Sequence, residues 1–173
     1  MQNKRSIIMA KVKDTGEFKM KEEFIGGAIV PFEKVKIKWA YLDKDRPDTR
    51  FDSSGVWKLE IILDKAQADA LKEVGFKVRQ DSEGDWLLTC KRKVRTAKGV
   101  MLQPPTVVDK DGRTPFTGMI GNGTLANVYV KAEYKEVGGK TYLPAYLNKV
   151  QILKLIPFDG IEMKDYSGEE FDD

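Results

Sequence analysis

Residues 34–41, Lys34-Val-Lys-Ile-Lys-Trp-Ala-Tyr41, alternate between apolar and basic side chains. A period of two is typical of a β-strand with one face packed and the other in solvent. The pattern places the two aromatic residues, Trp39 and Tyr41, on the apolar face, so we expect both rings in the core. It places Lys36 and Lys38 on the opposite, basic face.

The rest of the chain predicts strands around a single helix. Four further segments have strand character: Val56–Leu63, 86–95, 124–137 and 140–156. After the first of them, Asp64 and Gln67 have the spacing of a capping box, and Gly75 ends the helix that they begin. Five strands, one short helix and long loops favour an all-β fold, a five-stranded OB-like barrel, over a sandwich, which requires seven or more strands.

The length of 173 residues suits one domain with a hydrophobic core. Residues 1–30 are polar and charge-mixed, so we expect a partly ordered N-terminal arm. We assign residues 31–156 to the OB-like domain and residues 157–173 to a flexible acidic tail. The chain contains no apolar run of membrane-spanning length and no export signal.

The two parts of the chain differ in the sign of their charge. Residues 157–173 contain seven of the 27 acidic residues and one lysine, which leaves 29 Lys+Arg against 20 Asp+Glu in residues 1–156. A basic body suits a polyanionic partner, and an acidic tail on the same molecule can imitate that partner or recruit other proteins. The tail residues assigned to partner binding are Asp165, Glu169, Glu170, Phe171, Asp172 and Asp173.

The residue types present exclude many enzyme mechanisms. The chain has no histidine, which removes most zinc sites and the Ser-His and Cys-His nucleophile pairs. The single cysteine, Cys90, cannot form an internal disulfide, which favours a reducing cytoplasm. Asp109 and Asp111 begin like a calcium loop but lack the later ligands, so we expect a plain turn, no metal and no cofactor. The spacing of the loop residues Asp43, Asp45 and Asp48 could hold magnesium, so a magnesium-dependent nuclease is an alternative.

Nucleic-acid binding requires cations for phosphates and rings for stacking on bases. Phe51 and Phe116 lie in loops with polar neighbours, and Tyr129 shares a strand face with Lys131, so these three rings are the predicted stacking residues. The predicted nucleic-acid-binding set is Lys36, Lys38, Arg46, Arg50, Phe51, Lys91, Lys93, Arg95, Lys98, Arg113, Phe116, Tyr129 and Lys131.

From about residue 31 onward, the chain resembles the OB-fold single-stranded DNA-binding proteins that phages encode for replication. The resemblance is strongest in Pro-Thr-Val-Val-Asp-Lys-Asp-Gly (residues 105–112), Phe-Thr-Gly (116–118), Gly-Asn-Gly-Thr-Leu-Ala-Asn-Val (121–128) and Leu-Asn-Lys-Val-Gln-Ile-Leu-Lys-Leu (147–155). The helix after Leu63 and the acidic tail also resemble that family.

The resemblance implies a non-enzymatic protein that coats displaced DNA strands during replication or recombination in an infected bacterial cytoplasm. It also implies contacts between the tail and a polymerase or helicase, and a monomer or homodimer with no membrane association. Two binding alternatives remain open. One is a structural or protein-interaction module, and the other is an OB-type protein that prefers RNA, because composition does not report on the 2′-hydroxyl.

Overall fold

The computed structural model describes residues 19–158. In chain order the elements are η1 (Glu22–Phe24), β1 (Ala28–Tyr41), β2 (Val56–Leu63), α2 (Lys65–Glu73), β3 (Val78–Gln80), β4 (Trp86–Lys93), β5 (Thr106–Val108), β6 (Thr124–Ala132), β7 (Lys135–Val137), β8 (Lys140–Tyr142) and β9 (Ala145–Lys154). None of the helices in this part of the chain is long and apolar enough to cross a lipid bilayer.

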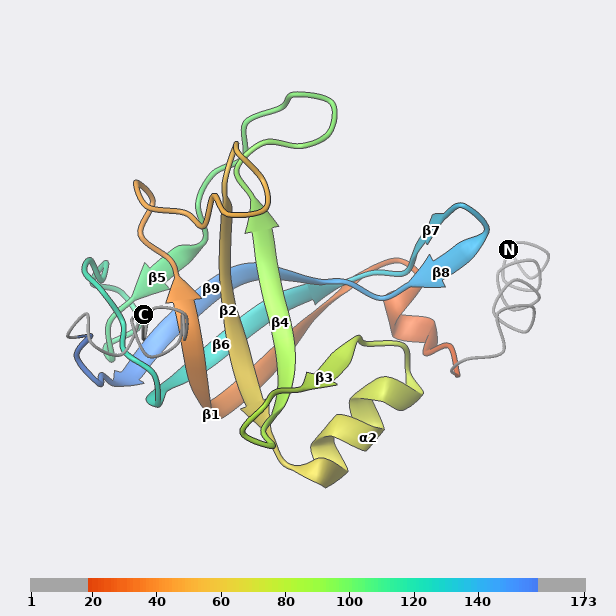
Figure 1. The fold of residues 1–173 in the computed structure, drawn as a ribbon, viewed down its shortest axis with the longest axis horizontal. Coiled ribbons are helices and arrows are strands. Elements are labelled where there is room, and N and C mark those ends of the chain that lie inside the picture. Colours follow the sequence, from red (N-terminus) through yellow and green to blue (C-terminus); the bar gives the residue numbers. More distant parts are fainter. Residues whose placement is uncertain (1–18, 159–173) are drawn as a thin grey trace.

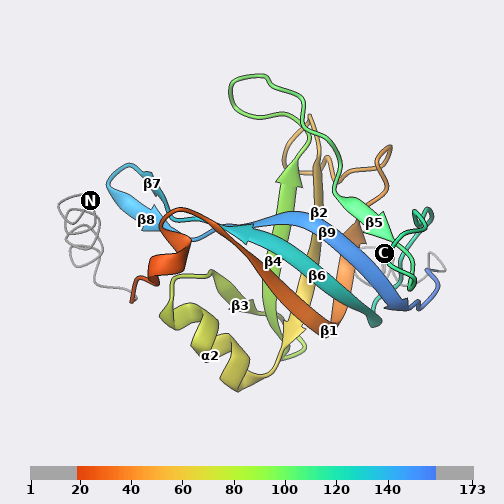
Figure 2. The ribbon, with the colours of Figure 1, turned by 180° about the vertical axis from the view of Figure 1, so that it is seen from behind.

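Seven strands form one sheet in the order β3-β4-β2-β1-β6-β9-β5, and β4 also pairs with β9. That additional parallel pairing, between Lys91 and Tyr146, closes β1, β2, β4, β9 and β6 into a ring. Figure 1 shows β2 and β4 crossing in front of β6 and β9, and Figure 2 shows β1, β6 and β9 from the other side. The predicted class, a five-stranded OB-like arrangement with one short helix, is therefore confirmed.

The core lies inside the ring, where alternate residues of each strand meet. Leu59 and Ile61 of β2, Leu88 of β4, Val128 of β6 and Leu147 of β9 are almost completely buried there. Because side chains alternate along a strand, their neighbours in sequence point outward. The outward residues of β2 and β4 include Lys58, Lys91 and Lys93.

The predicted capping box of α2 is present. The Asp64 carboxylate accepts a hydrogen bond from the Gln67 backbone, and the Gln67 side chain accepts one from the Asp64 backbone. Gly75 follows the helix with φ +113°, a left-handed conformation that costs glycine little. The helix follows the second strand of the ring, as the sequence indicated.

Two bulges in β1 bend this long strand from one layer of the ring to the other. They occur at Lys34 and Trp39, whose φ angles are +53° and +54°. Each backbone N–H is satisfied by an asparagine side chain: Asn127 Oδ1 accepts from Lys34 at 2.8 Å, and Asn122 Oδ1 accepts from Trp39 at 2.9 Å. Such bulges change the direction of a strand and redirect its side chains.

The second bulge makes the predicted core location of Trp39 and Tyr41 wrong. After the bulge, Tyr41 pairs with Lys58, an outward residue of β2, and neither ring belongs to the core cluster. Both side chains are partly exposed. An extra residue in the strand shifts the alternation by one position, and therefore residues beyond it exchange faces.

Two segments are more ordered than expected. Strand β1 begins at Ala28, before the predicted start after Pro31, and Phe24 in the expected arm is buried beside Phe76 and Tyr134 at ring centroid distances of 5.8 and 6.3 Å. The predicted connection 96–123 contains β5, which pairs with β9.

The last two predicted strands are each interrupted. β6 is separated from β7 at residues 133 and 134, and β8 is separated from β9 at residues 143 and 144. At the second break, Pro144 has no N–H to donate to the ladder. The hairpin of β7 and β8 projects beyond the ring in both views (Figures 1 and 2).

Candidate nucleic-acid interface

The outward surface of β2, β4 and the end of β1 is called the front face here and comprises Trp39, Tyr41, Lys58, Lys91 and Lys93. Tyr41 pairs with Lys58, Lys58 pairs with Lys91, and Lys93 lies opposite Val56. Directly paired residues have their Cβ atoms about 5 Å apart and point to the same side of a sheet. The front face therefore carries three lysines and two aromatic rings on adjacent strands.

The β1–β2 loop, residues 42–55, folds back over this face. Asp48 is joined to Val56 by two backbone hydrogen bonds, of 2.8 and 2.9 Å. Gly55, with φ +98°, fits tightly against Pro47, since a Cβ atom there would lie 2.7 Å from the proline ring. These contacts fix the part of the loop that carries Arg50 and Phe51.

Asp48 organises the cations of the loop. Its buried carboxylate accepts two hydrogen bonds from the Arg50 guanidinium, both 3.0 Å, and one ion pair of 2.9 Å from Lys58 Nζ. Burial alone would raise the pKa of Asp48, but the hydrogen bonds from Arg50 and Lys58 outweigh it and hold the pKa far below the ordinary value. Asp48 therefore remains an anion and keeps both cations in place.

Aromatic rings lie against the same cations. The Arg50 guanidinium lies 5.3 Å from the Tyr41 ring centroid and 5.6 Å from that of Phe51, and Lys58 Nζ lies 5.9 Å from both centroids. Phe51 is 88% exposed, which is unusual for so large an apolar side chain. A ring that is exposed and beside a cation is suited to stack on a base while the cation attracts phosphate.

A hairpin formed by residues 94–102 lies next to the β1–β2 loop, at the same end of the front face. Its Val94 N–H donates to Gly55 O at 3.1 Å, which joins the hairpin to the β1–β2 loop. Arg95 and Lys98 are exposed on it, and Arg95 Nη1 donates to Gly99 O. In Figure 1 the two loops stand together above β2 and β4.

The structure groups the predicted site residues into separate locations. Seven lie on or beside the front face: Arg46, Arg50, Phe51, Lys91, Lys93, Arg95 and Lys98. Lys36, Tyr129 and Lys131 lie on the outward surface of β1 and β6, on the opposite side of the ring. Arg113 lies in the turn after β5, and Phe116 is partly buried against the core and is not in a polar loop environment.

Lys38 has a structural role. Its Nζ lies 2.6 Å from Asp81, 3.1 Å from Asp85 and 3.2 Å from Glu83, and its side chain is only 5% exposed. Burial alone would lower the pKa of Lys38, but the hydrogen bonds to these acids raise it. The sequence predicted that Lys38 binds phosphate. Its ammonium belongs instead to an ion cluster that fixes the β3–β4 turn to β1.

The loop acids serve local structure. Among residues 19–158, the only group of carboxylates close enough to share a metal is Asp81, Glu83 and Asp85, where the Lys38 ammonium lies instead. Asp111 accepts hydrogen bonds from the backbone N–H groups of Arg113 and Thr114, which makes the expected turn. Cys90 is completely buried, and burial raises the pKa of its thiol.

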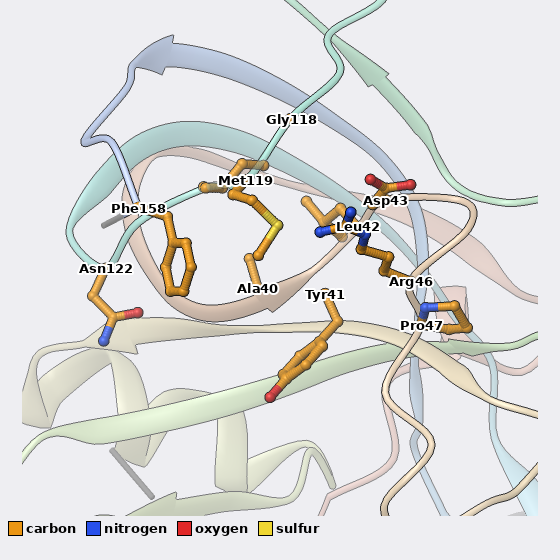
Figure 3. A pocket seen from close by; sticks show the side chains of 11 residues that line it. Ala40, Tyr41, Leu42, Asp43, Arg46, Pro47, Gly118, Met119, Asn122 and Phe158 are labelled. Carbon is orange, nitrogen blue, oxygen red and sulfur yellow. The ribbon is translucent and has the colours of Figure 1, made fainter. Parts of the chain in front are cut away.

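A small pocket of about 220 Å³ lies where the β1–β2 loop meets residues 118–122. Figure 3 shows Phe158, Met119, Tyr41 and Arg46 around it. Phe158 is the last residue that the structure describes, so the predicted tail residues, Asp165 to Asp173, lie outside the described part. Phe158 and Arg46 line the two ends of this pocket (Figure 3).

Sequence reasoning missed three members of this interface: Tyr41, Lys58 and Asp48. Lys58 was detectable, because it alternates with the core residues Trp57 and Leu59. Tyr41 was not, because no residue in the segment marks the bulge that turns it outward. Asp48 was weighed only as a metal ligand, although its spacing from Arg50 allows a local ion pair.

The strand order and the front face define a class: a small OB-type ring with a basic, aromatic surface over its second and third strands. OB folds bind oligonucleotides on that surface. No family model and no curated protein match this chain in sequence.

Solved structures of phage proteins share the fold. A C-terminally truncated single-stranded DNA-binding protein from bacteriophage Enc34 matches with a TM-score of 0.54 and 13% identity, over 82% of this chain and 96% of that chain. The Enc34 protein in complex with ssDNA matches with a TM-score of 0.53 and 14% identity, over 76% and 89%. The gp2.5 single-stranded DNA-binding protein of bacteriophage T7 matches with a TM-score of 0.52 and 17% identity, over 83% and 94%. This chain therefore has the fold of phage single-stranded DNA-binding proteins.

Proposed function

We propose that this protein binds single-stranded DNA with little sequence preference, on the front face and its two bordering loops. The observation that carries the proposal is the cluster in which Arg50 and Lys58 lie within 6 Å of the rings of Tyr41 and Phe51. Every base has a π-face, so such rings stack without regard to sequence. Exposed Lys91 and Lys93 continue the positive surface along β4.

The fold supports DNA as the ligand and a role in phage DNA replication or recombination. The solved neighbours are single-stranded DNA-binding proteins of phages, and one is in complex with ssDNA. We infer from the same likeness that the protein is not an enzyme, acts in the cytoplasm of an infected bacterium as a monomer or homodimer, and contacts a polymerase or helicase through its tail.

Binding of fluorescent oligothymidine, its duplex form and the matching RNA tests this function. We expect the single DNA strand to bind more tightly than the duplex, with a slope of log affinity against log salt near −0.7 for each phosphate contact. Equal affinity for duplex would contradict the proposal, and tighter RNA binding would favour the RNA alternative. Degradation of the strand in magnesium would indicate a nuclease. No binding at all would favour the protein-interaction alternative.

The acidic tail is proposed to compete with DNA for the front face. Phe158, the last described residue, lines the same pocket as Arg46 and Tyr41, and the acidic residues follow it directly in the sequence. A short flexible tether gives an effective concentration of about millimolar.

Deletion of residues 159–173 should therefore tighten binding of oligothymidine, and the gain should shrink as salt rises. The matched control keeps the tail length but changes its Asp and Glu residues to Asn and Gln, and it should behave like the deletion. Unchanged affinity in both variants would leave the tail only a recruiting or solubilising function.

A further inference from the structure

We propose that a bound single strand continues past the front face, across the pairing of β4 with β9, and that Tyr146 stacks on a base there. This inference rests on the proposed function and extends the site to a second surface. That surface, called the rear face here, is the outward side of β6 and β9 with the start of β1, and comprises Ile29, Tyr129, Lys131, Tyr146 and Lys149.

Strand register connects the two faces. Lys91 of β4 pairs with Tyr146 of β9, and Tyr146 pairs with Lys131 of β6. Together with the pairs of Tyr41 with Lys58 and of Lys58 with Lys91, this gives one row across five strands. Four strand spacings of about 4.8 Å make the row roughly 19 Å long, measured along the surface.

The row consists of rings and cations for its whole length. It starts at Tyr41, passes Lys58 and Lys91, reaches Tyr146 and ends at Lys131. Tyr146 is 38% exposed, and the Lys131 side chain is 52% exposed. No acid occupies a position in the row, so a strand that leaves the front face meets a ring and then another cation.

The rear face offers a second pair of the same kind beyond Tyr146. Lys149 Nζ lies 5.8 Å from the Tyr129 ring centroid, and Tyr129 pairs with Lys149 across β6 and β9. Glu133 borders this area and lies 4.0 Å from Lys131 and 3.5 Å from Lys135. Exposed pairs of this length contribute little, so Lys131 remains available to a phosphate.

The length of the ligand separates this inference from the function on which it rests. OB folds occupy about 4 to 16 nucleotides. An oligothymidine of about 4 nucleotides should bind the front face alone, whereas one of about 16 should also reach the rear face. Only the longer ligand should therefore respond to changes at Tyr146.

The test compares both ligands with Tyr146→Ala and Tyr146→Phe, after unfolding curves confirm that each variant is folded. We expect Tyr146→Ala to weaken binding of the longer strand by roughly 5- to 150-fold, the range for one stacked base, and to change the shorter by less than about twofold. Tyr146→Phe keeps the ring and should retain wild-type affinity. The inference would be overturned if Tyr146→Ala left the affinity for both oligothymidines unchanged, or if it lowered both affinities equally.

A second variant keeps the test decisive if Tyr146→Ala does not fold. Lys131→Gln should make the negative slope of log affinity against log salt shallower by about 0.7 for the longer strand and leave the slope for the shorter one unchanged. An unchanged slope with the longer strand would also overturn the inference. If the wild-type protein binds neither length, the proposed function itself fails.

Discussion

Replacing Tyr41 and Phe51 together by alanine should lower the affinity for oligothymidine by roughly 10²- to 10⁴-fold. Stacking contributes about 1–3 kcal/mol per base, and both ring centroids lie within 6 Å of the same guanidinium, that of Arg50. Neither ring is part of the core cluster, so the free energy of unfolding should change little. Fluorescence anisotropy with a labelled oligothymidine measures the loss.

The matched control for these rings is Tyr142→Ala. Tyr142 is 45% exposed on the β7–β8 hairpin, outside the front face. The Tyr142→Ala variant should bind oligothymidine with wild-type affinity. If Tyr142→Ala weakens binding as much as the double variant does, the rings of the front face have no special part in recognition.

Asp48→Asn should lower the free energy of unfolding by about 3 kcal/mol at neutral pH, because it leaves Arg50 and Lys58 without their buried anion. Since the pKa of Asp48 is lowered by folding, its ion pairs stabilise the protein fully above the unfolded value of about 3.9 and are lost as the pH falls toward the folded value. The difference between wild type and variant should therefore shrink as the pH falls from about 5 to 2.

Urea unfolding at several pH values measures this effect. The control is Asp69→Asn, because Asp69 also pairs with two lysines, Lys65 and Lys72, but is exposed on α2. Exposed pairs contribute little, so this variant should unfold like the wild type. The organising role of Asp48 would be contradicted if Asp48→Asn lowered the free energy of unfolding as little as the control does. It would also be contradicted if the decrease became larger at low pH.

The sequence predicted those parts of the fold that follow from local pattern. Strand β2 has the predicted bounds, and the capping box of α2 forms between the predicted residues, because alternation and capping depend only on near neighbours. At the bulge, the Trp39 N–H donates a hydrogen bond to a residue far away in the chain, Asn122, and no local pattern reports such a contact. The faces assigned to Trp39 and Tyr41 were wrong for that reason.

The candidate site was predictable in composition but not in arrangement. The sequence analysis assigned Lys91, Lys93 and Lys131 alike to the binding site. The closed ring, however, places Lys131 on the other layer. The predicted site also included Lys38, whose three acidic partners come from a turn more than forty residues further along the chain. Side-chain ion pairs between distant segments decide which cations remain available, and these pairs require the fold.

The salt dependence of single-strand binding by Lys91→Gln/Lys93→Gln measures the central claim most directly. If the front face holds phosphates, this double variant should make the negative slope of log affinity against log salt shallower by about 1.4, since each contact on a single strand contributes about −0.7. The control, Lys77→Gln/Lys140→Gln, removes two exposed lysines outside both faces and should keep the wild-type slope. An unchanged slope for the front-face variant, or an equal change for the control, would contradict binding at this surface.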